Sequence, residues 1–320
     1  MKIVILGAGA LGSVLGAHLA RAGEEVIFIA RGQRAQSLQE YGITITGLAN
    51  FTVPVTVTVQ PEAVHEADVL LVAVKTYATE SALQSVRHLA VESVVSVQNG
   101  VLKNEQVARH FGWEKTLGAA AMVSGELTPD GAVRFTLNAG FWLGELPAGT
   151  SARAEALVTA LDRAGIRAET SSQIESVEWS KYVGFAGAMA IAALTRLETY
   201  KMHKDPALAY VSVMMQREMA LLATTLGIPL GDYGVIRAKT RTSMAIEEAV
   251  AFLRQTGESQ EARGATAHKI SALQDLERGR RLEVEEILGY AVRKGAELGV
   301  PLPMVDTCYR LLTGINSYLQ

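Results

Sequence analysis

The chain has 320 residues, of which 49% are hydrophobic and 20% charged, and its formal net charge is −3. This composition is typical of a folded globular protein, and at about 300 residues roughly three quarters of the unfolded surface can be buried without disulfide support. The near-neutral balance argues against a nucleic-acid-binding protein, which usually carries a basic excess. Cys308 is the single cysteine, so we expect no internal disulfide and a reducing, cytoplasmic environment. The longest apolar stretch, 182–194, is shorter than a membrane-spanning helix, and we expect no membrane partner.

The first half of the chain alternates short β-branched runs with helix-like segments. The candidate strands are 2–6, 25–29, 43–46, 53–59, 69–74 and 94–97. Segments 11–22 and 80–90 have the composition of helices. This alternation predicts a parallel, doubly wound α/β sheet. A β-rich stretch at 117–144, with a turn at Pro129-Asp130-Gly131, is expected to add antiparallel strands.

The second half reads almost entirely as helix. Asp205-Pro206 joins an N-cap residue to a proline at the first helical position. Gly227 and Gly299, each followed two residues later by proline, are typical helix stops. We therefore expect a Rossmann-type dinucleotide-binding domain over residues 1–170 and an all-helical substrate and catalytic domain over residues 171–320.

A glycine-rich turn follows the first expected strand. Residues 7–12 form the pattern G-x-G-x-x-G and open a helix with leucines on one side. Gly7 allows the tight turn, Gly9 leaves room for a pyrophosphate, and Gly12 lets the helix pack closely on the strand. The alternative is a strand-to-helix turn that binds no ligand. The predicted cofactor-binding residues here are Gly7, Ala8, Gly9, Ala10, Leu11 and Gly12.

The end of the second expected strand distinguishes NADP from NAD. NAD enzymes usually place an acidic residue there to bind the ribose 2′-hydroxyl. This strand ends without an acid, and the guanidinium of Arg31, with Arg34 nearby, suits a 2′-phosphate. We therefore predict NADP(H), the alternative being that Arg31 is a solvated loop residue. Lys75 and Asn99 follow two further strands, where this fold binds ligands, although Asn-Gly is also a common turn pair.

One lysine falls on an apolar helical stripe in the second half. Lys181 shares its spacing with Val177 and Phe185. A buried ammonium is costly unless a partner or polar cavity receives it. Such a group can donate a proton to the alkoxide formed when hydride reaches a ketone, or it can instead extend along the helix to water. Glu283 flanks a second apolar stripe and is the expected inward carboxylate, with a solvated acidic face over 283–286 as the alternative.

Together these residues resemble the ketopantoate reductase (2-dehydropantoate 2-reductase) family over nearly the whole chain. The resemblance lies in residues 2–12, in Val97-Gln98-Asn99-Gly100, in Trp179-Ser180-Lys181, and in Ser271-Ala272-Leu273-Gln274-Asp275 followed by Leu282-Glu283. It implies NADPH-dependent reduction of 2-dehydropantoate to pantoate, a step toward pantothenate and coenzyme A. The partner is then a small 2-oxo acid, and this chemistry needs no metal.

Carried over by position, the resemblance assigns roles to single residues. Lys181 corresponds to the general acid, Asn99 to a contact with nicotinamide and substrate, and Ser271 to a ligand of the substrate carboxylate. Glu283 corresponds to a residue beside the cofactor or substrate. The other implied cofactor contacts are Lys75 and Ser124.

Three positions depart from the family pattern. Phe185 and Met189 stand where asparagines follow the lysine by one and two turns, and His268 stands where an asparagine precedes the serine by three residues. Since polar contacts dominate substrate discrimination, the keto acid is left open. Arg196 is a candidate for carboxylate binding, or otherwise a surface residue at the helix end. The alternatives are a related NADP-dependent reductase with another, more apolar substrate and a non-catalytic NADP-binding sensor; a homodimer is an open expectation.

Overall fold

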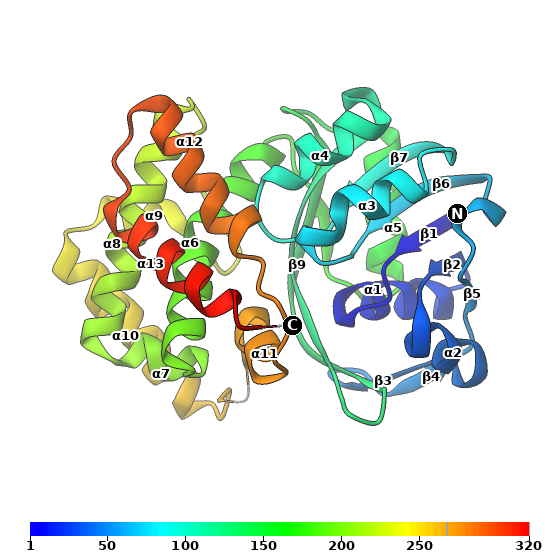
Figure 1. Cartoon of the computed structure of the whole chain (residues 1–320), viewed down its shortest axis with the longest axis horizontal. Coiled ribbons are helices and arrows are strands. Elements are labelled where there is room, and N and C mark those ends of the chain that lie inside the picture. Colours follow the sequence, from blue (N-terminus) through cyan, green and yellow to red (C-terminus); the bar gives the residue numbers. More distant parts are fainter. Residues whose placement is uncertain (267, 320) are drawn as a thin grey trace. The chain divides into compact units, whose positions relative to one another are not determined.

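The computed structural model describes residues 1–266 and 268–319. The chain divides into two compact units (Figure 1). Unit 1 comprises Met1–Asn99 and Lys103–Glu175, and unit 2 comprises Gly100–Leu102 and Ser176–Gln320. The sequence placed the division after residue 170, slightly before the end of unit 1, and did not indicate that Gly100–Leu102 packs with the helical unit.

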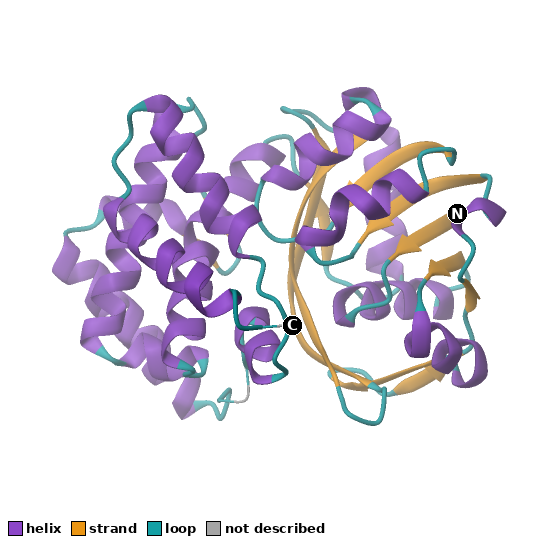
Figure 2. Cartoon of the chain, viewed as in Figure 1, coloured by secondary structure: helices purple, strands orange, loops and turns teal. Residues whose placement is uncertain are grey.

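Unit 1 is built on one ten-stranded sheet, drawn as orange arrows in Figure 2. Its strands lie in the order β4 (Phe51–Val53), β3 (Ile43–Gly47), β9 (Val133–Glu145), β8 (Thr116–Leu127), β7 (Ala90–Ser96), β6 (Glu66–Val72), β1 (Lys2–Leu6), β2 (Glu25–Ile29) and β5 (Thr56–Thr58), while β10 (Ala168–Thr170) pairs with β9. The neighbours from β7 through β6, β1 and β2 to β5 are parallel. The antiparallel pair β8–β9 confirms the hairpin expected from the turn at 129–131.

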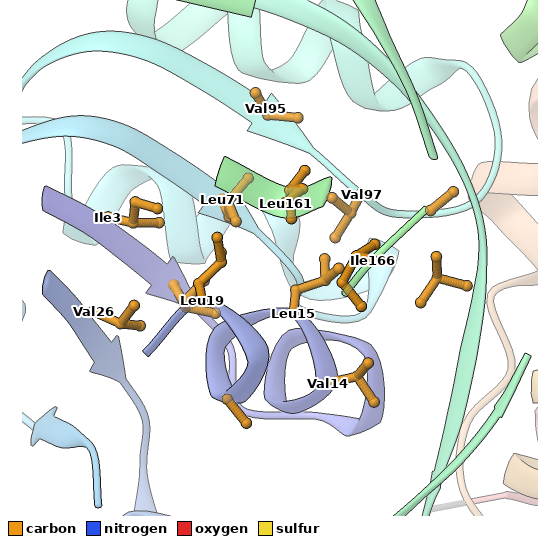
Figure 3. Close-up of a cluster of buried hydrophobic side chains, with 14 of the residues drawn as sticks. Ile3, Val14, Leu15, Leu19, Val26, Leu71, Val95, Val97, Leu161 and Ile166 are labelled. Carbon is orange, nitrogen blue, oxygen red and sulfur yellow. The ribbon is translucent and has the colours of Figure 1, made fainter. Parts of the chain in front are cut away.

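Helices cover both faces of the parallel strands because each strand is apolar on both sides. On one face, α1 (Ala10–Arg21) and α5 (Ala152–Arg163) pack on Ile3, Leu71 and their neighbours in the cluster of Figure 3. On the other face, α3 (Thr79–Ser85) and α4 (Leu102–Phe111) pack on the alternate residues of the same strands. A further helix of the unit, α2 (Gly32–Tyr41), follows β2. The α/β fold predicted from the alternating pattern is confirmed.

Two expected elements of unit 1 are shorter than predicted. The strand expected at 53–59 is split into β4 and β5, because Pro54 lacks the N–H that a continuing ladder needs. The helix expected at 80–90 ends at Ser85, and the chain turns through a hydrogen bond from Leu89 N to Val86 O before β7 begins at Ala90.

Unit 2 is helical apart from a two-stranded hairpin, β11 (Asp232–Tyr233) and β12 (Ile236–Arg237), which corrects the all-helical prediction. Its helices are α6 (Ile174–Thr195), which begins in unit 1, α7 (Thr199–Lys204), α8 (Pro206–Thr225), α9 (Ala238–Ser243), α10 (Ile246–Ala262), α11 (Ser271–Glu277), α12 (Tyr290–Leu298) and α13 (Pro303–Asn316). A π-helical turn, Glu285–Gly289, leads into α12.

The predicted helix boundaries of unit 2 are confirmed where local chemistry sets them. The carboxylate of Asp205 accepts the N–H groups of Ala207 and Leu208 at the start of α8. Gly227, two residues after the end of α8, and Gly299, directly after α12, adopt positive φ angles of 75° and 67°. Within the described ranges, no helix combines the length and apolar character needed to cross a bilayer.

Candidate active site

The glycine turn between β1 and α1 leaves no space for a side chain at Gly7 or Gly12 but leaves space at Gly9. Gly7 has a φ of 109°, and a Cβ there would lie 2.8 Å from Val74 N. A Cβ on Gly12 would lie 2.3 Å from the carbonyl oxygen of Gly7. At Gly9 the nearest atom to an added Cβ, Ala73 O, is 4.0 Å away, and no side chain caps α1. An anion therefore has room at Gly9, beside the positive end of the helix, which fits a dinucleotide pyrophosphate.

Arg34 holds this turn from the side. Its guanidinium donates to Ala8 O at 3.1 Å, to Ser13 Oγ at 3.0 Å and to Gly131 O at 2.8 Å. Burial lowers the pKa of Arg34 from its usual value. The sequence grouped Arg34 with Arg31 as a phosphate ligand, but the structure uses its donors internally. Arg31, in contrast, is exposed at the N-cap of α2.

A buried glutamine organises the loops that carry Lys75 and Asn99. The Gln98 amide accepts from Ser96 Oγ at 2.8 Å and donates to Val74 O at 2.8 Å and Thr79 Oγ1 at 2.7 Å. Thr79 in turn donates to Thr76 O at 2.7 Å, so the carbonyls on both sides of Lys75 are held by one network. Sequence reasoning included Gln98 in a motif but assigned it no role. The clue was an amide directly after the expected strand 94–97.

These segments meet at one edge of the sheet. The strands β2, β1, β6 and β7 are parallel neighbours, so their carboxyl ends lie side by side. Arg31, the glycine turn, Lys75 and Asn99 directly follow those four ends. The structure thus gathers four of the predicted cofactor-binding elements, which are far apart in the sequence, at the edge where this fold binds ligands.

Ser124 lies on the long strand β8. A Cβ on the next residue, Gly125, would contact Val14 of α1 at 2.9 Å, and Val123 belongs to the same cluster as α1. Side chains alternate along a strand, so Ser124 points to the opposite face of the sheet. Its proposed contact with the cofactor stays a prediction.

In unit 2, Lys181 lies on the less buried stripe of α6. Its neighbours Ser180 and Tyr182 are buried, whereas Lys181, Gly184 and Phe185 are half-buried. Residues spaced by three or four positions share a helix face. Lys181 therefore lies along one partly open strip of an otherwise buried helix.

A tyrosine next to the lysine joins α6 to the segment that carries Glu283. The hydroxyl of Tyr182 donates to Ile287 O at 2.5 Å, inside the π-helical turn. Complete burial raises the pKa of Tyr182 well above its usual value, so the hydroxyl stays neutral and able to donate. Glu283 precedes the turn and is only 8% exposed, while Glu285 is half-buried and accepts the Tyr309 hydroxyl at 2.7 Å. The expected inward carboxylate is therefore the buried one.

The remaining substrate candidates differ in their surroundings. Ser271 is half-buried at the first position of α11. Arg196 directly follows the end of α6, is exposed, and has a φ of 57°. Phe185 is half-buried on the Lys181 stripe, whereas Met189 is 1% exposed in the core of the unit.

An open cavity of about 680 Å³ lies elsewhere in unit 1. It is lined by His18 and Arg21 near the end of α1, by Phe135, and by Arg163. None of the predicted site residues lines it, and the part of α1 from the glycine turn to His18 spans about 12 Å at 1.5 Å per residue.

Comparison with known proteins defines the class. The family model described as "Ketopantoate reductase PanE/ApbA" matches residues 3–148, and "Ketopantoate reductase PanE/ApbA C terminal" matches residues 173–316. This class implies an oxidoreductase with a nicotinamide cofactor and a small keto acid substrate. The chain belongs to the ketopantoate reductase family.

Single relatives agree over the full length. A 2-dehydropantoate 2-reductase of Archaeoglobus fulgidus is 32% identical, over 99% of each chain. The crystal structure of a PanE/ApbA family ketopantoate reductase from Ralstonia eutropha JMP134 is 27% identical, covers 99% of each chain and gives a TM-score of 0.83. A ternary structure of D-mandelate dehydrogenase with NADH and anilino(oxo)acetate, at 22% identity, 99% coverage of each chain and a TM-score of 0.85, shares the fold.

Proposed function

We propose that the chain reduces 2-dehydropantoate to pantoate with NADPH as the electron donor. The observation that carries the proposal is the glycine turn, open at Gly9 and set at the same sheet edge as Arg31, Lys75 and Asn99. Family membership and the full-length relative from Archaeoglobus fulgidus support the substrate.

The cofactor is held by unit 1. The backbone of residues 7–12 binds the pyrophosphate, and Lys75, Asn99 and Ser124 make further contacts. Arg31 binds the 2′-phosphate, since β2 ends without an acid and this guanidinium is exposed at its end. When bound, the reduced nicotinamide supplies a hydride to the keto carbon.

Lys181 is the general acid. As the keto carbon is reduced, the ammonium of Lys181 stabilises the growing negative charge on the oxygen and donates a proton to it, which contributes about 10²–10⁴ in rate. Glu283, whose side chain is buried, is the carboxylate that we assign to orient this ammonium. Asn99 orients the substrate beside the nicotinamide, and Ser271 donates a hydrogen bond to the substrate carboxylate.

A second candidate is a 2-oxo acid reductase with a more apolar substrate. Phe185 lies on the same half-buried stripe as Lys181, and Met189 lies in the apolar core. Neither supplies the amide donor that would bind the hydroxyl of 2-dehydropantoate, so an alkyl or aryl 2-oxo acid fits these residues. A non-catalytic NADP-binding protein would turn over none of these compounds.

The test measures NADPH oxidation at 340 nm with 2-dehydropantoate and, separately, with 2-oxoisovalerate and phenylpyruvate. A preference for 2-dehydropantoate supports the proposal, and a preference for the others supports the second candidate. Lys181→Ala is expected to lower kcat about 10²–10⁴-fold without changing the Kd of NADPH. Lys181→Arg is the matched control, because it keeps the positive charge but does not release a proton near neutral pH. Full activity of Lys181→Ala removes Lys181 from the mechanism, and full activity of Lys181→Arg removes its role as the proton donor.

A further inference from the structure

An arginine of unit 2 lies against the lysine helix without an anion of its own. Arg241, on α9, is half-buried, and its Nε is buried without a hydrogen-bond partner. A Cβ added to Gly184 of α6 would lie 2.9 Å from Nη2 of this arginine. Over residues 1–266 and 268–319 the Arg241 guanidinium makes no hydrogen bond and no ion pair within 4 Å. Gly184 is thus the position that lets the guanidinium rest on the helix backbone.

The carboxylate that acts on Arg241 does not pair with it directly. Asp232 attracts the guanidinium from beyond 4 Å, and its own hydrogen bonds come from the N–H and the hydroxyl of Thr240. Burial and the nearby Arg241 charge lower the pKa of His203 to about 4, so this imidazole is neutral at pH 7. Burial also lowers the pKa of Arg241 to about 10, which still leaves it cationic. A half-buried guanidinium with a buried, unpaired N–H costs stability until an acceptor binds it.

Arg241 is linked to the two segments that carry Lys181 and Ser271. Gly184 follows Lys181 by one helical turn on the same half-buried stripe, a spacing of about 5–6 Å between Cβ positions. On the other side, both Arg241 and His268 act as neighbouring charges on His203. His268 leads into α11, whose first residue is Ser271. The guanidinium therefore lies against the lysine stripe at Gly184, and it shares His203 as a neighbour with the segment that leads to Ser271.

We propose that Arg241 binds the carboxylate of the 2-oxo acid substrate. The guanidinium fork matches a carboxylate with two parallel N–H···O bonds, and the substrate would supply the anion that the protein does not. With the carboxylate on Arg241 and Ser271, the adjacent keto group is directed along the stripe toward Lys181. This assignment rests on the proposed function.

The experiment compares charged and neutral forms of one substrate. The 2-oxo acid that the wild type reduces fastest and its primary amide are assayed with the wild type, Arg241→Gln, Arg241→Lys and Arg237→Gln. Arg241→Gln is expected to raise KM for the acid about 10–100-fold, with little change in kcat, in KM for the amide or in the Kd of NADPH. Arg241→Lys should recover part of the loss. Arg237, four residues earlier, is exposed, so Arg237→Gln is a control with the same change in net charge.

The outcomes separate this proposal from the proposed function. If Arg241→Gln weakens acid and amide equally, or neither, Arg241 does not recognise the carboxylate and the proposal is overturned. If the wild type reduces no 2-oxo acid, the proposed function fails, and titration calorimetry with oxamate in the presence of NADP⁺ decides the site alone. Oxamate binding to the wild type but not to Arg241→Gln supports the carboxylate site, whereas equal binding, or none to either, overturns it.

Discussion

The proposed cofactor-binding edge of unit 1 and a cluster of Arg241, His203 and Gln260 in unit 2 treat their buried polar groups differently. At this edge of unit 1, the side chains of Arg34 and Gln98 form their hydrogen bonds with other residues of the same unit. In the unit 2 cluster, the Nε of Arg241 is buried without a partner among the described residues, and Arg241 and Gln260 both act on the imidazole of His203. Buried polar atoms in folded proteins are normally paired. The sheet edge of unit 1 is therefore complete without a ligand, whereas the cluster in unit 2 needs a ligand or water to pair its buried atoms.

The sharpest test on the unit 1 side compares two glycines of the same turn. Gly12→Ala should cost about 3 kcal/mol or more of unfolding free energy, because its Cβ would collide with the Gly7 carbonyl. Gly9→Ala should cost about 1 kcal/mol or less, since its surroundings are open. The same change should instead weaken NADPH binding at least tenfold, roughly 1.4 kcal/mol. Denaturant unfolding and NADPH fluorescence titration measure both effects; wild-type stability of Gly12→Ala would contradict the packing at this turn.

In unit 2, the buried imidazole of His203 should make the stability of the protein depend on pH. The pKa of His203 is about 4 in the folded chain and about 6.5 when unfolded. Between these values the unfolded state binds more protons, so the stabilisation present above pH 6.5 is lost as the pH falls toward 4, by up to about 3 kcal/mol. Burial lowers the pKa of His268 as well, which acts in the same direction.

His203→Gln should reduce this loss of stability at acidic pH. The measurement is the free energy of urea unfolding at several pH values between 4 and 7, for the variant and the wild type. Parallel curves for the two proteins would show that His203 does not cause the dependence.

Removing the Gln98 hydrogen-bond network of unit 1 should lower stability by a smaller amount and should also weaken NADPH binding. Gln98→Met keeps the length of the side chain and leaves Val74 O and Ser96 Oγ without their partner, which should cost about 2 kcal/mol. Because the same network holds the carbonyls beside Lys75, the Kd of NADPH should rise several-fold. Gln84→Met, at an exposed position of α3, is the control and should change neither quantity. An unchanged Kd in Gln98→Met would limit the network to a role in stability.

Local patterns predicted the parts of this chain whose chemistry is local. The glycine turn, Asp205-Pro206 and Gly227 each act on residues within a few positions, and the structure has them as expected. The role of Arg34 was missed because its acceptor Gly131 is 97 residues away. Arg241 was missed because it lies on a short helix with no periodic pattern, and only folding brings it to Gly184.

The smallest expected effect concerns Arg196, the one described non-glycine residue with a positive φ. Glycine is favoured after a helix end in this conformation, so Arg196→Gly should stabilise unit 2 by about 0.5–1 kcal/mol. Arg196→Ala removes the charge but keeps the strained backbone, and should give no such gain. If the carboxylate is bound at Arg241, both variants should keep the wild-type kcat/KM for the acid. A tenfold fall in kcat/KM with both, measured beside thermal unfolding, would instead show that the exposed guanidinium of Arg196 binds substrate.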